Sequence, residues 1–482
     1  MKITKKEILF TIIVATCATL LLMYIILPKI KLASIANQIE HIQSMPGFAG
    51  STVVVDARYE GSKESIISIQ SDILVHPGSN YKLLTAAASL HYLTPDFTFK
   101  TNFSTFEHNG KKHLLIEGSG DPTFHREDIQ AIAQTLREKN ILITGNLYYD
   151  DSYFQGEKYG PDWKAEWKDI HFGVPISALQ IDDNILYIKG KGSAAKKNLT
   201  TSTASLENYP AIIDKRVVVT TPAPHKVTTK MDVTGTIIIE GETSGDEEFS
   251  TTTNLQNPSQ ITAEVFRQEL SQNGIISAKS QVIALENLTP EKTLIYQQVS
   301  APLSEIVRRM LTFSKNNYGE TLIRTLGEEV NKSSKNPNSQ AKGVELLRKF
   351  LQTEVNIQEG DFTGLDGSGM SPSSRITGRG IMQLFEYVNK QPWKDIYWNA
   401  LPTSSNEGTL HYRFMGAELQ HQVIAKTGTH DFASSLSGKI PREHDTILFS
   451  IHIFNHHVAS EFIGSDVQPI IDMIVKMLDE RL

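Results

Sequence analysis

The chain has 482 residues, of which 40% are hydrophobic and 21% are charged. This balance is typical of globular proteins, and the length predicts two or three domains. The net charge of -7, without a basic block, argues against a nucleic-acid partner. The single cysteine, Cys17, excludes an internal disulfide and leaves no thiol chemistry for the rest of the chain.

An apolar segment near the N-terminus has the length of a membrane span. The uncharged run from Ile8 to Pro28 meets the roughly 20 residues that a helix needs to cross a bilayer. Lysines at positions 2, 5 and 6 favour an N-terminus inside the cytoplasm. Two interpretations stay open, an uncleaved signal anchor over residues 1–31 or a signal peptide cut near Ser34-Ile35-Ala36. The run exceeds the apolar core of a usual signal peptide, so we favour the anchor.

The first elements after this segment alternate between helix and strand. Residues 32–45 are predicted to form a short amphipathic helix, and residues 51–56 and 65–70 a β-hairpin. After Pro77 and Gly78 the pattern becomes that of a strongly apolar helix rich in small residues. Such a helix is expected to be packed closely on several sides.

The pattern of predicted secondary structure then changes twice along the chain. From about Phe97 to Gln297, short alternating strands and loops rich in Ser, Thr, Gly and Lys predict an insertion of one or two mostly-β domains. From Ala301 the pattern is helical through Phe350. Strands are predicted near residues 422–426 and over 446–453, followed by an amphipathic helix over 467–482.

Ser79 and Lys82 form the first motif that carries chemistry. Three residues apart on a helix, they lie on one face and within contact distance. A serine hydroxyl becomes a nucleophile when a base takes its proton, and a desolvated lysine can be that base. Ser193 and Ser339 have the same S-x-x-K spacing, but no apolar helix follows Ser193, and Ser339 lies in a polar stretch of Asn, Ser and Lys. Taken alone, Ser79 would suit a helix N-cap equally well.

A second motif is Ser314-Lys-Asn316, placed at the start of a predicted helix. The S-x-N spacing is common in this chain and is weak evidence by itself. Asn317 with Glu320 would also make a capping box for the following helix.

The third motif, Lys426-Thr-Gly428, is the only K-T-G in the chain. It follows the apolar residues 423–425, which places it at the end of a strand. The order S-x-x-K, S-x-N, K-T-G is the three-part pattern of penicillin-recognising serine enzymes.

Flanking segments extend this pattern to a family resemblance over nearly everything after the apolar segment. The chain resembles the D-Ala-D-Ala carboxypeptidase/endopeptidase branch of the low-molecular-mass, class C penicillin-binding proteins. The segments that carry the resemblance are 77–86, 117–124, 300–303, 314–320, 366–371, 401–402 with 407–410, and 425–429. It implies an α/β (α+β) fold, a serine β-lactamase/transpeptidase-like domain with an antiparallel sheet and helices. Residues 32–97 and 298–482 would form it, interrupted by the mostly-β insertion 98–297.

The resemblance also implies acyl transfer on peptidoglycan stem peptides, with β-lactam antibiotics as covalent ligands and without a cofactor or metal. Ser79 would be the nucleophile, Lys82 its base, and Ser314 the relay to the leaving amine. The residues expected to bind substrate are Asn316, Lys426, Thr427, Gly428 and Thr429, together with Asp151 and Arg375 at the free end of the diamino acid. The backbone N–H groups of Ser79 and Thr429 would bind the oxyanion. The enzyme would work in the bacterial periplasm, anchored to the cytoplasmic membrane or, after cleavage, soluble.

Two alternatives stay open. A β-lactamase would share the motifs, but the long insertion and the missing deacylation glutamate motif count against it. A catalytically silent cell-wall-binding scaffold would share the fold, but the complete motifs count against that. His456 and His457 with Glu461 are interpreted as a solvated turn rather than a metal site.

Overall fold

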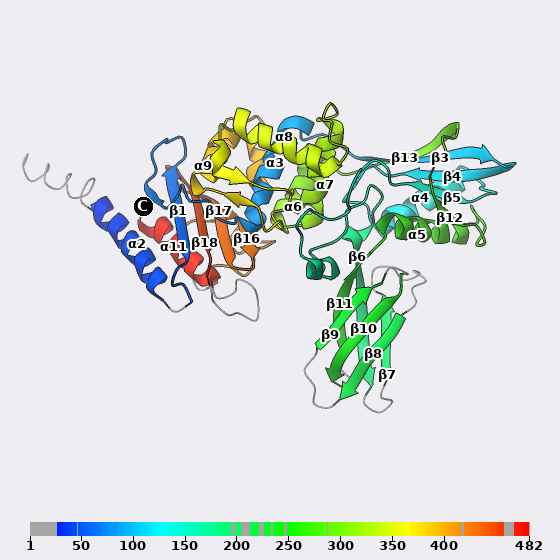
Figure 1. The fold of residues 1–482 in the computed structure, drawn as a ribbon, viewed down its shortest axis with the longest axis horizontal. Helices are drawn as coiled ribbons and strands as arrows, with labels where there is room; N and C mark the ends of the chain where they lie inside the picture. The colour runs from blue at the N-terminus through cyan, green and yellow to red at the C-terminus, as the bar shows by residue number, and fades with distance from the viewer. Residues whose placement is uncertain are drawn as a thin grey trace, which may run out of the picture.

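The structure is a computed structural model. It describes residues 27–45, 47–193, 198–203, 213–220, 226–232, 235–244, 248–286, 288–415, 419–456 and 467–481. Within these ranges, no helix has the length and apolar character that a membrane span requires. The predicted anchor over residues 1–31 lies almost entirely outside them. Figure 1 shows an elongated molecule with one lobe at each end of its long axis and a third projecting from the side.

The first lobe is built on a five-stranded antiparallel sheet. Its strands are β1 (Thr52–Tyr59), β2 (Ile67–Ile69), β16 (Ile424–His430), β17 (Ala433–Pro441) and β18 (Thr446–Phe454). Their order in the sheet is β16-β17-β18-β1-β2. The pairing of β1 with β2 confirms the predicted hairpin, and the two predicted C-terminal strands are also confirmed. Because β1 pairs with β18, the two ends of the chain form one sheet.

Helices cover both faces of this sheet. On one face lie α2 (Leu27–Ser44) and α11 (Gln468–Arg481), which confirm the first and last predicted helices. Ile35 and Ile39 of α2 and Ile471 of α11 pack against alternate residues of β1, such as Val53 and Val55. Figure 1 shows both helices beside the blue and red strands.

The other face carries a helical layer that holds the largest core. Its helices are α3 (Lys82–Leu93), α6 (Leu303–Thr312), α7 (Asn316–Glu329), α8 (Ser339–Thr353), α9 (Gly378–Val388) and α10 (Lys394–Asn399). α3 lies at the centre, and nearly all its residues are buried, as predicted for the small-residue helix. Asn338 caps α8 and Thr377 caps α9, each by accepting a backbone N–H hydrogen bond.

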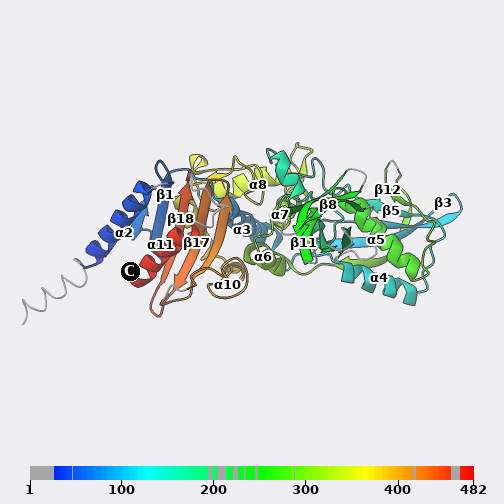
Figure 2. The same ribbon diagram turned by 90° about the horizontal axis from the view of Figure 1, so that it is seen from below.

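The second lobe belongs to the insertion and contains a mixed five-stranded sheet. Its strands are β3 (Lys100–His108), β4 (Lys111–Glu117), β5 (Leu147–Asp150), β12 (Val282–Ala284) and β13 (Lys292–Val299), in the order β12-β5-β4-β3-β13. The helices α4 (Arg126–Glu138) and α5 (Pro258–Gln272) lie together beside this sheet (Figure 2). β4 pairs in parallel with β5, and β5 with β12.

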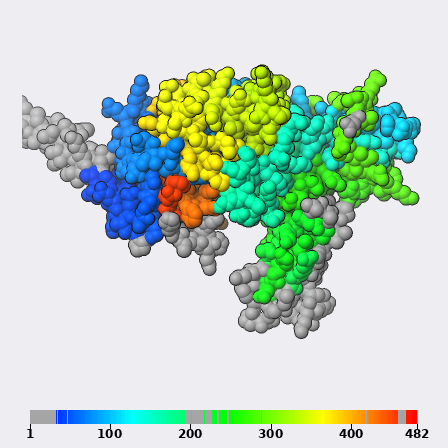
Figure 3. All heavy atoms as spheres, viewed as in Figure 1, coloured from blue at the N-terminus to red at the C-terminus, as the bar shows by residue number. Residues whose placement is uncertain are grey.

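The third lobe consists of two three-stranded sheets. Its strands are β6 (Ile185–Ser193), β7 (Asn198–Thr203), β8 (Ile213–Thr220), β9 (Lys226–Met231), β10 (Ile237–Ser244) and β11 (Glu248–Asn254). They form the sheets β8-β10-β9 and β11-β6-β7. This lobe projects from the body in the space-filling view (Figure 3). The mixed α/β class is thus as predicted, and the division of residues 98–297 into domains stays a prediction.

Candidate active site

Ser79 lies in a 3₁₀ turn, η2 (Gly78–Tyr81), directly before α3. Neither η2 nor α3 has a side-chain cap, so the interpretation of Ser79 as an N-cap is wrong. Gly78 has a φ of +52°, and a Cβ there would lie 2.6 Å from the Thr429 nitrogen. A Cβ at Gly428 would lie 2.2 Å from the Pro77 carbonyl oxygen. The two glycines therefore let the backbone of β16 lie against the turn that carries Ser79.

The amine of Lys82 is fully buried and contacts three oxygens. Its Nζ lies 2.8 Å from Ser79 Oγ, 2.6 Å from Asn316 Oδ1 and 2.8 Å from the Ser368 carbonyl oxygen. Asn316 donates from Nδ2 to the Phe172 carbonyl oxygen, which turns its Oδ1 toward the lysine. Two of the three neighbours of Nζ can only accept hydrogen bonds. A neutral amine has two N–H donors for them and one lone pair left for the Ser79 hydroxyl proton.

Burial lowers the pKa of Lys82 from 10.5 to about 7, and the carboxylates of Asp366 and Glu320 oppose this shift. A large fraction of the amine is then neutral near neutral pH. The nearby Lys426 is not among the causes of this shift. Lys426 is itself fully buried, and burial followed by the charge of Lys82 holds its pKa well below the ordinary value.

Ser314 and Lys426 form the opposite side of the site. Lys426 Nζ donates to Ser314 Oγ and to the Thr427 carbonyl oxygen, each at 2.9 Å. Ser314, two residues before the start of α7, has a φ of +59°, which a serine rarely adopts. Thr427 donates from its hydroxyl to Thr409 at 2.9 Å. The structure thus brings the predicted hydroxyls and amines of all three motifs together.

The loop of residues 366–371 is fixed by two buried carboxylates whose role the sequence did not indicate. Glu320 accepts hydrogen bonds from the N–H groups of Gly367 and Ser368, both at 3.0 Å, and pairs with Arg324 at 3.0 Å. Asp366 accepts from the N–H groups of Gly369 and Ser371. These bonds hold the Ser368 carbonyl toward Lys82. Glu320 therefore does not form the predicted capping box, and Lys315 is the N-cap residue of α7.

His76 and His430 were not singled out in the sequence, yet they join the same loop to the other motifs. His76 Nδ1 accepts the Gly78 N–H at 3.0 Å, and its Nε2 lies 3.0 Å from the Ser371 carbonyl oxygen. One neutral tautomer satisfies both contacts. Burial, then the nearby His430, lowers the pKa of His76 to about 3, which keeps the ring neutral. His430 Nε2 lies 3.1 Å from the Met370 carbonyl oxygen.

A segment of the insertion, residues 159–173, forms part of the site. Its Phe172 carbonyl accepts from Asn316, and the indole of Trp163 donates to Asp366 at 3.3 Å. Trp167 meets the ring of His430 edge-on, with centroids 5.3 Å apart. The aromatic residues of this segment are its one signal in the sequence, but they do not indicate what the segment packs against.

Asp151 and Arg375 contact different residues. Asp151 accepts from the Ser177 hydroxyl and the Ala178 N–H, both at 2.7 Å. Arg375 donates to the Pro372 and Ser374 carbonyls, and its guanidinium lies 5.2 Å from the centroid of the Phe454 ring. No described contact links Asp151 with Arg375, and their binding role stays a prediction.

Two other groups of residues that the sequence singled out are Ser339 with Lys342 and the segment that begins at His456. Ser339 begins α8 and donates to Glu328 at 2.5 Å, while Lys342 pairs with the same carboxylate. His456 is only 3% exposed, so its expected place in a solvated turn is wrong. Residues 457 and 461 lie outside the described ranges. Among the residues that the structure describes, no group of three or more His, Cys, Asp or Glu could hold a metal.

A sheet flanked by helices, with an S-x-x-K turn packed against a K-T-G strand, defines the class of penicillin-recognising serine enzymes. Residues 31–478 match the model of the D-Ala-D-Ala carboxypeptidase 3 (S13) family. The chain therefore belongs to this family. It is a serine-type D-Ala-D-Ala carboxypeptidase of the penicillin-binding kind, as the sequence predicted.

Individual relatives agree with this assignment. The chain is 26% identical to a D-alanyl-D-alanine carboxypeptidase of Actinomadura sp. (strain R39), over 87% of this chain and 81% of the relative. It is 25% identical to D-alanyl-D-alanine carboxypeptidase DacB of Haemophilus influenzae, over 81% of this chain and 82% of the relative. Its fold is similar to that of penicillin binding protein 4 of H. influenzae, with a TM-score of 0.78 and 21% identity. The match covers 92% of this chain and 98% of that structure. The fold is also similar to that of the Bd0816 predatory endopeptidase of Bdellovibrio bacteriovorus, with a TM-score of 0.53 and 16% identity. This match covers 89% of this chain and 94% of that structure.

Proposed function

We propose that Ser79 attacks the carbonyl carbon of a D-alanyl peptide bond and forms an acyl-enzyme. Neutral Lys82 takes the Ser79 proton as the Oγ–C bond forms. The N–H groups of Ser79 and Thr429 bind the oxyanion. The proximity of Gly78 to the Thr429 nitrogen supports this assignment, because it places that N–H beside the turn of the nucleophile.

The leaving amine receives its proton through Ser314. Lys426, at 2.9 Å from Ser314 Oγ, orients this hydroxyl. With Thr427, Gly428 and Thr429 on the edge strand β16, Lys426 also offers N–H and O–H donors to the carboxylate of the substrate. Water then hydrolyses the acyl-enzyme, and Lys82 in its neutral form can activate that water from the same position.

The main support for this mechanism is the set of atoms around the amine of Lys82. Lys82 Nζ lies between one hydroxyl and two oxygens that only accept hydrogen bonds, in a fully buried place. A protonated amine would leave no lone pair for Ser79. Burial therefore supplies the base that the chemistry needs, without a histidine or a metal.

Labelling with a fluorescent penicillin tests the proposal. The wild-type protein is expected to give a covalent band, and Ser79→Ala is expected to give none. Ser193→Ala is the matched control, since Ser193 belongs to another S-x-x-K match and lies in β6 of the third lobe. Loss of the band in Ser193→Ala but not in Ser79→Ala would contradict the proposal. A band that disappears within seconds in the wild type would favour the β-lactamase alternative, because a β-lactamase releases its product rapidly.

For the natural substrate we propose the stem peptides and D-alanyl cross-links of peptidoglycan. A carboxypeptidase and an endopeptidase cut the same kind of bond after a D-alanine, so a single acyl-enzyme serves both. The similarity in fold to a predatory endopeptidase supports the second activity. Purified cross-linked and linear muropeptides, separated by chromatography after digestion, would measure each activity. Equal loss of both in Ser79→Ala is the expected outcome.

We also propose that the enzyme works in the bacterial periplasm and is held at the membrane by residues 8–28. Ile35 is fully buried in the core beneath the first sheet, together with Ile39. A cut after Ala36 would remove Ile35 from this core, so its burial supports an N-terminal segment that is not cleaved there. The N-terminal residues of the protein isolated from membranes, determined by mass spectrometry, would check this. A mature chain starting near residue 37 would contradict it.

A further inference from the structure

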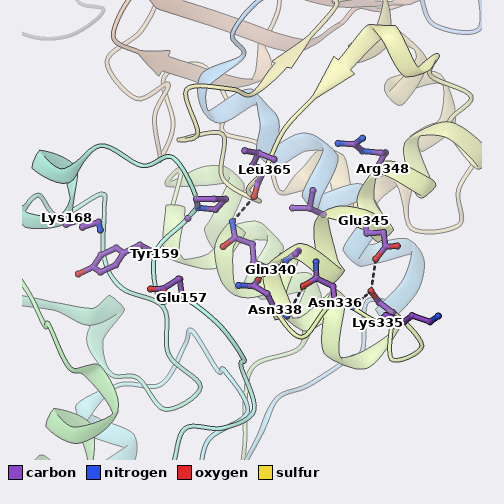
Figure 4. A pocket seen from close by; sticks show the side chains of 15 residues that line it. Glu157, Tyr159, Lys168, Lys335, Asn336, Asn338, Gln340, Glu345, Arg348 and Leu365 are labelled. Atoms are coloured by element: carbon purple, nitrogen blue, oxygen red, sulfur yellow. Dashed lines mark hydrogen bonds between the residues drawn. The ribbon is translucent and has the colours of Figure 1, made fainter.

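A pocket of about 830 Å³ lies between the insertion and helix α8 (Figure 4). Residues between Glu157 and Lys168 form one wall, and residues between Ser334 and Arg348 form the other. Leu365 lies at the edge where the two walls approach each other. This volume is within the range of sites that bind small organic ligands. The mechanism proposed above uses none of the residues that line the pocket.

The charges of this pocket favour an anionic ligand. Its lining contains Lys168, Lys335 and Arg348 but only two acids, Glu157 and Glu345. The Glu345 carboxylate already accepts a hydrogen bond from Ser334 at 2.7 Å. Among the described residues, no carboxylate lies within ion-pair distance of any of the three cations. A guanidinium without a partner at a pocket wall is suited to bind a carboxylate with two hydrogen bonds.

The neutral part of the lining favours a ligand with a sugar ring and amide groups. The ring of Tyr159 lies beneath Lys168 Nζ at 4.7 Å, and its hydroxyl donates to Gln256 at 3.1 Å, which fixes the ring. Asn338 uses its Oδ1 to cap α8, and its Nδ2 has no acceptor among the described residues. A fixed aromatic face beside amide donors and cations matches the hydroxyl, acetamido and carboxylate groups of a glycopeptide.

The same segment of the insertion joins this pocket to the catalytic residues. The rings of Tyr159 and Trp163 lie 6.5 Å apart, and Trp163 donates to Asp366 in the loop that faces Lys82. Gln340, which lines the pocket, donates to the carbonyl of Leu365, the neighbour of Asp366. Both contacts connect the walls of the pocket to the loop of residues 366–371 beside Lys82.

We propose that this pocket binds a carboxylate-bearing glycopeptide unit of peptidoglycan other than the stem peptide being cut. The enzyme would then hold its polymeric substrate at two points, and the pocket would distinguish the polymer from a free peptide. This inference rests on the proposed function, since it takes peptidoglycan as the substrate.

The direct test is binding to protein whose Ser79 is already acylated by penicillin, so that the catalytic site is occupied. The probe is a soluble disaccharide-tripeptide from peptidoglycan, which has no D-alanyl bond to cut, measured by calorimetry. We expect the acylated wild type to bind it, and Arg348→Glu to weaken binding at least about tenfold through loss of a charge-assisted contact. Lys349→Glu is the matched control, because Lys349 is the exposed neighbour on α8 and does not line the pocket.

Cleavage gives a second, independent measurement. The ratio of activity on intact peptidoglycan to activity on a free pentapeptide is expected to fall in Arg348→Glu and in Tyr159→Ala, and to stay unchanged in Lys349→Glu. No binding to the acylated wild type, or equal binding by Arg348→Glu and Lys349→Glu, would overturn the pocket proposal while penicillin labelling of Ser79 still supports the proposed function. If penicillin fails to label Ser79, the proposed function fails, and the same binding comparison is made on unlabelled protein.

Discussion

The imidazole rings of His76 and His430 lie against each other in a tilted arrangement, with centroids 3.9 Å apart and an angle of 31° between their planes. One ring stands two residues before the turn that carries Ser79, and the other directly follows the K-T-G-T segment. Each ring also contacts a backbone carbonyl of the loop 366–371. The pair therefore fixes the relative positions of the three segments that surround the nucleophile.

This relationship predicts that His76 is a positioning residue. His76→Ala removes the acceptor for the Gly78 N–H, and we expect acylation by penicillin to slow about tenfold. His76→Asn should restore part of the rate, because an asparagine side chain can accept the N–H two residues ahead. His444→Ala, at a side chain 86% exposed, is the control. Stopped-flow acylation and thermal unfolding check this, and equal rates for His76→Ala and wild type would contradict it.

Acylation should depend on pH through Lys82. The base must be neutral, and burial lowers its pKa from 10.5 to about 7. We therefore expect the acylation rate to rise about tenfold per pH unit below pH 7 and to level off above it. Rates with a chromogenic β-lactam between pH 5 and 9 measure this. A rate that keeps rising to pH 9 would show an amine with an ordinary pKa.

Gly428 should not tolerate a side chain. A Cβ there would lie 2.2 Å from both the Pro77 carbonyl oxygen and Ser435 Oγ, and the former is backbone that cannot rotate away. We expect Gly428→Ala to push β16 away from η2, to lose about 1–3 kcal/mol of unfolding free energy and to impair acylation. Gly360→Ala is the matched control, since no atom lies within 4 Å of its Cβ. Denaturant unfolding and penicillin labelling measure both effects, and similar behaviour of the two variants would refute the prediction.

Glu320 should be important for stability as well as for the catalytic loop. Glu320 and Arg324 are buried, with 0% and 1% of their side chains exposed. Glu320→Ala leaves the Arg324 charge without its partner, and we expect a loss of about 3–5 kcal/mol. Glu248→Ala breaks the pair with Lys191, whose side chains are 78% and 55% exposed, and should give no measurable change. Thermal unfolding compares the two variants, and equal stability would contradict a buried pair.

The predicted recognition of the diamino acid by Arg375 has a test of its own. Arg375→Glu reverses a charge on β15 (Arg375–Ile376), and we expect it to weaken cleavage of stem peptides with a free diamino-acid end more than cleavage of peptides without one. Michaelis constants for matched pairs of peptides give the comparison. Equal losses on both peptides would remove Arg375 from the substrate-binding residues.

Much of this enzyme could be predicted from the sequence because short-range patterns carry the information. The apolar, small-residue stretch after Ser79 gave a buried helix, and β-rich segments at both ends of the chain gave strands. S-x-x-K fixed the contact between Ser79 and Lys82, since a helical geometry brings residues three apart together. The order of the three motifs then indicated the class of enzyme.

Only the tertiary structure decided what surrounds the base. Lys82 meets Asn316 and Ser368 across 234 and 286 positions of sequence. Glu320 matched a capping pattern in the sequence, but in the fold it holds a loop more than forty positions away. His76 lies two residues before η2 and His430 is the last residue of β16, so their contact joins segments far apart in the sequence. Such contacts leave no local pattern, because they are set by how elements pack and not by the residues between them.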